Sequence, residues 1–182
     1  MCLLKRYRKW RKRRHDRIYE GPSDDIDGGT RISFNEDAPK EIQSRELVSF
    51  SCRFSALSLN ENETKLIRGV YNFGASKGAE GVSTTVGCNN PRVVPEGERK
   101  AIHSEKFLQT IDALLRKYNV AEHNGYYYKV SGLPDFYGAK VDCEYASGET
   151  LYCYNNQDPF LPIEFVHELC RLFGVKQENK DV

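Results

Sequence analysis

Polar and apolar residues alternate with a period of two from residue 46 onward, a pattern typical of a strand with one side on a core and one side toward water. The apolar positions of this first run are Val48, Phe50, Cys52 and Phe54. Similar runs follow at 66–75 and 82–88, and a segment rich in Gly and Lys joins them. Together the three runs predict an antiparallel meander.

The period then changes to 3.6, which indicates an amphipathic helix. Its apolar stripe consists of Phe107, Leu108, Ile111, Leu114, Leu115 and Tyr118. Ser104 is suited to cap the start of this helix, and Asn119 can adopt the left-handed conformation that ends it. A second amphipathic pattern begins at Pro162 and is followed by Gly174, which predicts a shorter helix near the end of the chain.

Between the two predicted helices the period of two returns at 126–130, 139–145 and 150–154. Ser147 and Gly148 form a turn signal between the last two runs, so these are expected to make a hairpin. The predicted order is β-β-β-α-β-β-β-α. This order favours an α+β fold in which an antiparallel sheet of about five to six strands carries two amphipathic helices on one face.

Composition divides the 182 residues into four parts. Residues 1–20 form a basic N-terminal arm, and 21–45 are rich in Gly, Pro and acids and are expected to be a largely irregular linker, with only Ile32 and Phe34 hinting at a strand. Residues 46–174 are expected to form a single domain, and 175–182 a C-terminal tail.

The chain has no run of 18 apolar residues and no apolar stretch after its basic start, so we expect neither a membrane-spanning helix nor a secretory signal. A cytoplasmic location follows as the expectation, with the six cysteines reduced. Five of them fall in or beside apolar patterns, which favours thiols that fill the core over a metal site.

Charge is distributed unevenly. The arm has nine basic and two acidic side chains, a charge of +7, whereas the other 18 basic and 24 acidic side chains give −6. Flexible cations can neutralise phosphates, and Trp10 can stack on an unpaired base, so we expect the arm to contact nucleic acid or an anionic membrane surface. The candidate contacts are Lys5, Arg6, Arg8, Lys9, Trp10, Arg11, Lys12, Arg13, Arg14 and Arg17. The alternatives are a solvated arm and an arm that docks on the acidic part of its own chain.

The sequence has no phosphate-binding loop, dinucleotide fingerprint or nucleophile elbow, and no C-x-x-C pair. Glu164 and His167 have the spacing of a carboxylate-bridged metal site, but such a site needs a second copy of the motif and the sequence has none. We therefore predict no catalytic residue, metal or cofactor, and a non-catalytic binding or interaction module. An exposed sheet edge also allows a homodimer. The alternative is a small enzyme or a small-ligand-binding protein whose site lies at the end of the last predicted strand. Its candidate residues are Tyr152, Tyr154, Asn155, Asn156 and Asp158. The amides could instead cap the helix that follows.

A set of short motifs between 48 and 173 resembles uncharacterised domains of unknown function from Gram-positive bacteria of the Firmicutes type. The matching motifs are Val48-Ser49-Phe50-Ser51, Lys117-Tyr118-Asn119-Val120, His123-Asn124-Gly125-Tyr126, Tyr145-Ala146-Ser147-Gly148-Glu149, Pro162 and Leu172-Phe173. The resemblance implies a bacterial α+β domain. Because these domains have no assigned activity, it implies no catalytic residue.

Overall fold

The computed structural model describes residues 29–132 and 137–175. Its elements in chain order are β1 (Thr30–Phe34), β2 (Leu47–Ser55), α2 (Glu61–Thr64), β3 (Val70–Gly78), β4 (Gly81–Cys88), β5 (Glu98–His103), α3 (Lys106–Lys117), a 3-10 turn (Val120–His123), β6 (Tyr126–Val130), β7 (Ala139–Tyr145), β8 (Thr150–Asn155) and α4 (Ile163–Leu172).

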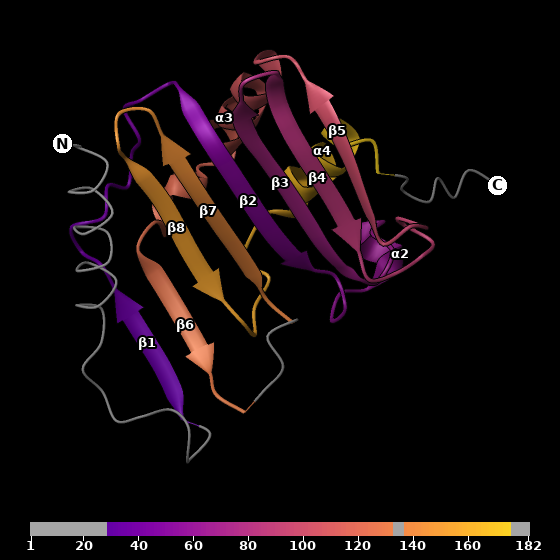
Figure 1. Cartoon of the computed structure of the whole chain (residues 1–182). Coiled ribbons are helices and arrows are strands. Elements are labelled where there is room, and N and C mark those ends of the chain that lie inside the picture. Colours follow the sequence, from indigo (N-terminus) through magenta and orange to yellow (C-terminus); the bar gives the residue numbers. More distant parts are fainter. Residues whose placement is uncertain (1–28, 133–136, 176–182) are drawn as a thin grey trace.

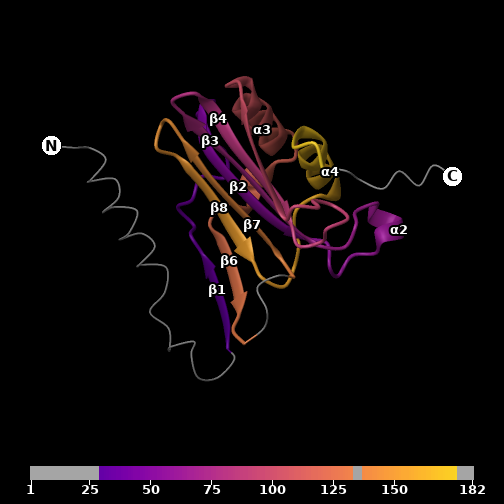
Figure 2. The same cartoon turned by 45° about the vertical axis from the view of Figure 1, so that its right-hand side comes forward.

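All eight strands belong to one sheet in the order β1-β6-β8-β7-β2-β3-β4-β5. Every neighbouring pair is antiparallel except β6 and β8, which run parallel. Helices α3 and α4 lie on one side of the sheet, behind the strands in the view of Figure 1 and to their right in Figure 2. The opposite side, which no described helix covers, is called the open face below.

The structure confirms an α+β fold with a mostly antiparallel sheet, but the predicted numbers of strands and helices are wrong. The described residues form eight strands and three helices. Strand β5 was missed because five of its six residues are exposed, so its sequence shows no buried side. Helix α2 buries no residue and depends on its cap, in which the Asn60 side chain accepts a hydrogen bond from the N–H of Asn62.

The core lies between the sheet and the two longer helices. Helix α3 buries five residues of the predicted apolar stripe, with Ile111 fully inaccessible, whereas Tyr118 follows the helix and is partly buried. Asn119 comes next at a φ of 50°. Helix α4 buries Phe165, Val166, Leu169 and Cys170 against the same sheet. No helix in the described part of the chain is both long and apolar enough to cross a membrane.

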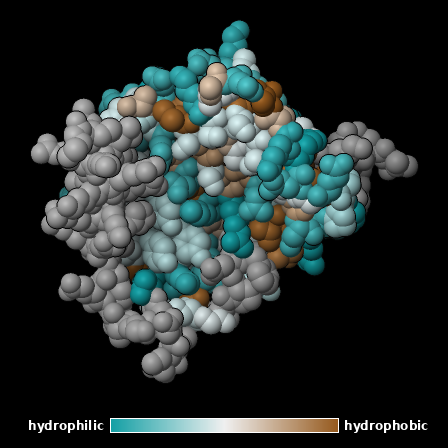
Figure 3. Space-filling view, viewed as in Figure 1, coloured by the Kyte–Doolittle hydropathy of each residue, from teal (hydrophilic) through white to brown (hydrophobic). Residues whose placement is uncertain are grey.

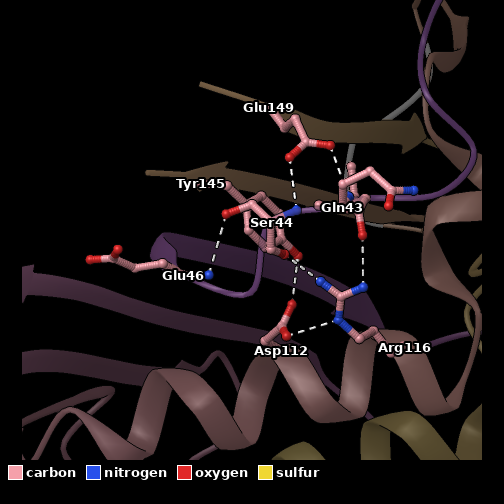
Figure 4. A network of polar contacts seen from close by, with 8 residues as sticks. Gln43, Ser44, Glu46, Asp112, Arg116, Tyr145 and Glu149 are labelled. Atoms are coloured by element: carbon pink, nitrogen blue, oxygen red, sulfur yellow. Dashed lines mark hydrogen bonds and ion pairs between the residues drawn. The ribbon is translucent and has the colours of Figure 1, made fainter. Parts of the chain in front are cut away.

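A polar network fastens the segment before β2 to helix α3 (Figure 4). The Asp112 carboxylate accepts hydrogen bonds from Arg116 Nε at 2.9 Å and from the Tyr145 hydroxyl at 3.1 Å. The Arg116 guanidinium also donates to the carbonyl oxygen of Ile42 at 2.7 Å and to that of Ser44. Because Asp112 is only 5% exposed, the ion pair is sheltered from water.

Candidate binding surface

One row of side chains crosses the open face from edge to edge. Strand register places its members side by side in the order Ser33, Tyr127, Tyr154, Lys140, Arg53, Asn72, Gly87 and Glu98. With strands about 4.8 Å apart, eight strands give a row on the order of 34 Å long. The row lies perpendicular to the strands and therefore brings together residues far apart in sequence.

Tyrosines form the part of the row on β6 and β8. The rings of Tyr127 and Tyr154 lie 5.1 Å apart between centroids at an interplanar angle of 35°. Tyr152 lies two residues before Tyr154, on the same face of β8, and its ring is 5.3 Å from the Nζ of Lys140. Burial, with the neighbouring Tyr127, raises the pKa of Tyr152 to about 12, so its hydroxyl is protonated at neutral pH.

Cations surround these rings. Arg31 of β1 is opposite Lys129 of β6, and Arg53 of β2 is opposite Lys140 of β7. By the alternation of side chains along each strand, all four lie on the open face. We call the set Arg31, Arg53, Tyr127, Lys129, Lys140, Tyr152 and Tyr154 the tyrosine–cation surface.

Acidic residues limit this surface on one side. Asp142 lies beside Lys140 with an ion-pair distance of 3.6 Å, and Glu144 follows on the same strand and face. The open face is hydrophilic to neutral over most of its described area, with apolar residues in separate patches (Figure 3).

A shallow depression of about 290 Å³ lies next to the two acids. Its lining is mostly small side chains, namely Ser49, Ser51, Gly74, Ala75, Ser76, Ser83 and Thr85. A Cβ at Gly74 would come within 2.5 Å of the Thr85 Oγ1, so the centre of the face is closely packed at this point. A second depression of about 320 Å³ is lined by Arg53, Val70, Asn72 and Asn89 at the other end of these strands. Beyond the tyrosines, the first depression therefore lies beside the row, and the second includes Arg53 and Asn72 of the row itself.

The five residues of the alternative ligand site do not share one face of the sheet. Tyr152 and Tyr154 belong to the open face, whereas Asn155 points to the helix-covered side. The Asn155 Oδ1 accepts hydrogen bonds from the N–H groups of Gln157 at 2.9 Å and Asp158 at 3.0 Å, which forms the turn after β8.

The Asn156 side chain is also used in hydrogen bonds within the fold. Its side-chain oxygen accepts from the N–H of Val130 at 2.9 Å, and its amide nitrogen donates to the Val130 carbonyl at 3.0 Å. The Asn155 amide therefore holds the turn after β8, the Asn156 amide joins this turn to the end of β6, and a ligand site at this position stays a prediction.

The ten candidate arm residues, from Lys5 to Arg17, lie outside the residues that the structure describes. Contact between the arm and an anionic partner likewise stays a prediction, supported by the sequence charge alone.

The cysteines of the described residues are all buried. Burial raises the pKa of Cys52 and Cys143, and that of Cys153 to about 12. Their thiols are therefore protonated at neutral pH and are poor nucleophiles. Within 29–132 and 137–175, no group of three or more His, Cys, Asp or Glu side chains is placed to hold a metal ion.

Sequence reasoning selected only Tyr152 and Tyr154 from the tyrosine–cation surface. The other members were missed because their proximity depends on which strands are neighbours. Alternation along 126–130 and 139–145 was the available signal, since it sends every second side chain to the polar face. No protein-family model, curated protein or solved structure matches the chain.

Proposed function

We propose that this protein is a non-catalytic binding module that holds single-stranded nucleic acid on the open face of its sheet. The observation that carries the proposal is the Tyr127–Tyr154 ring pair, which lies among four cations on a face that no described helix covers. The basic arm adds further contacts to phosphates.

The chemistry of the surface suits unpaired bases. Aromatic side chains on a sheet stack on bases, and nearby Lys and Arg side chains neutralise the phosphates between them. Asp142 and Glu144 repel phosphate along one side of the tyrosines. A bound strand is therefore expected to follow the side on which Arg31 and Lys129 lie.

A lipid surface fits these residues less well. Membrane-surface binding depends on large apolar side chains that enter the headgroup region. The tyrosine–cation surface has none, and its only rings are half-buried tyrosines. Its composition therefore favours nucleic acid over an anionic membrane.

The test compares neighbouring tyrosines of β6 that face opposite sides of the sheet. Tyr127→Ala, and separately Tyr154→Ala, should weaken binding of a labelled single-stranded RNA about tenfold, since stacking on one base contributes about 1–3 kcal/mol. Tyr128→Ala is the matched control and should bind like the parent, because its ring is on the helix-covered side. Fluorescence anisotropy with the full chain measures all four proteins.

Salt dependence tests the arm in the same assay. Replacing Arg11, Lys12, Arg13 and Arg14 together by Gln should reduce the slope of log affinity against log salt by about 0.7 for each phosphate that the arm no longer neutralises. Duplex DNA and anionic vesicles serve as competing partners. Equal effects of Tyr127→Ala and Tyr128→Ala, or binding to vesicles alone, would contradict the proposal.

A further inference from the structure

Strand β1 is one of the two edges of the sheet that the described residues form. It has β6 as its only neighbour among the described strands. The N–H of Asn35 donates to Gly125, and the N–H of Ser131 donates to Gly29, which fixes the odd-numbered residues of β1 as those that bond to β6. The backbone groups of Thr30, Ile32 and Phe34 consequently point away from the sheet.

The same strand carries two of the four large apolar side chains that are exposed among the described residues. Ile32 is 51% exposed and Phe34 is 64% exposed. Phe34 packs on Tyr126 at 5.1 Å between ring centroids, and Tyr126 contacts Phe160 at 6.5 Å. We call Ile32, Phe34, Tyr126 and Phe160 the apolar ledge. It lies on the helix-covered side, but β1 and β6 extend beyond α3 and α4 (Figure 1).

The opposite edge of the sheet is different. Strand β5 has the charged side chains Glu98, Arg99 and Lys100, and the Arg99 guanidinium is held by the carbonyl oxygens of Phe173 and Gly174. Charged edge strands resist pairing with another strand. Of the two edges, β1 is the one whose composition allows pairing.

We propose that β1 pairs antiparallel with β1 of a second copy of this chain, forming a symmetric dimer with one continuous sheet. A two-fold axis through Ile32 pairs Ile32 with itself and Thr30 with Phe34 of the second copy. This register uses all three outward-pointing residues at once. The two apolar ledges then meet across the axis and cover each other.

Charge supports a second copy as the occupant. In the symmetric register Arg31 lies opposite Ser33 of the second copy, so no like charges face each other. The chain's own arm is a poorer occupant, because its nine cations would lie next to Arg31 and Lys129.

The test is the oligomeric state of the full chain, measured by sedimentation over a wide range of concentrations. The parent should dimerise, and Ile32→Lys should remain monomeric because two lysines would meet at the axis. Ile102→Lys is the matched control, since Ile102 is 62% exposed on the other edge strand, and it should dimerise like the parent. A monomeric parent, or equal behaviour of the two variants, would overturn the proposal.

Two further measurements show whether a second copy or the same chain covers the β1 edge, and the RNA-binding assay tests the proposed function separately. In a Cys2→Ser background, Ile32→Cys should form a covalent dimer on mild oxidation and Ile102→Cys should not. Amide-exchange protection of Ile32 should rise with protein concentration, and protection independent of concentration would show that the same chain covers the edge. RNA binding reports on Tyr127 and Tyr154, so failure of either proposal is visible without the other.

Discussion

Asp112 shows how one buried charge can determine a local arrangement. The residue is on the buried side of α3, where an unpaired carboxylate would be costly, and Arg116 one turn later supplies the opposite charge. All three nitrogen atoms of Arg116 donate a hydrogen bond, because the two terminal nitrogens hold the carbonyl oxygens of Ile42 and Ser44. The pair therefore joins a helix to the segment that leads into β2.

Arg116→Met should lower the free energy of unfolding by about 3 kcal/mol, since it leaves the Asp112 charge buried without its cation. The neighbouring Lys117→Met removes an ion pair with Glu168 that is 57% exposed at the lysine, and should cost less than about 1 kcal/mol. Urea unfolding of both variants measures the difference. Equal losses of stability would mean that the buried Asp112–Arg116 pair contributes no more to the free energy of unfolding than the exposed pair does.

At the scale of elements, sequence periodicity predicted the helices and strands that bury one side in the core. Helix α3 was predicted because its six apolar residues form a single stripe, and the turn at Gly148 was predicted because it needs a positive φ, here 88°. Edge strands lack such a signal. Strand β5 is exposed on much of its surface and shows no buried side, and β1 offered only the alternation of Ile32 and Phe34, so pairing with β4 and β6 makes them strands.

The candidate surface was less predictable for the same reason. Alternation shows that Lys140 and Tyr154 each lie on a polar side of a strand, but not that they are neighbours. The parallel pairing of β6 with β8, which brings Tyr127 to Tyr154, depends on long-range contacts that no local pattern encodes. A register shift of one residue would have sent the same rings to the opposite face.

Glu149, in the turn between β7 and β8, should make the stability of the fold depend on pH. The N–H of Gln43, together with the Ser147 hydroxyl and the N–H of Ser44, lowers the pKa of Glu149. Because its folded pKa lies below the unfolded value of about 4.3, Glu149 stabilises the fold above that pH, and the contribution is lost as pH falls through the folded pKa.

Glu149→Gln should therefore be less stable than the parent at neutral pH, and the difference should shrink under acid conditions. Thermal unfolding at a series of pH values measures it. Glu80→Gln, in the exposed turn between β3 and β4, is the control and should follow the parent throughout. A difference between Glu149→Gln and the parent that does not change with pH would argue against this role of the carboxylate.

At the scale of the whole molecule, one continuous core links the strands to both longer helices. Five buried thiols are distributed over it, namely Cys52 on β2, Cys88 on β4, Cys143 on β7, Cys153 on β8 and Cys170 on α4. Since they belong to the same cluster of buried residues, each is exposed only when sheet and helices separate.

In a Cys2→Ser background, these five thiols should resist a thiol reagent in the native protein and become reactive together as urea unfolds the domain. The physical reason is that burial excludes the reagent from all five thiols and raises the pKa of Cys52, Cys88, Cys143 and Cys153. Ser83→Cys, at an exposed position of β4, is the control and should react at once. Mass spectrometry after timed labelling gives the rate at each site. If Cys88 or Cys170 reacts well before Cys52, Cys143 and Cys153, the domain opens in parts. The central strands would then unfold as a cooperative unit separate from the part of the domain that contains the earlier-reacting thiol.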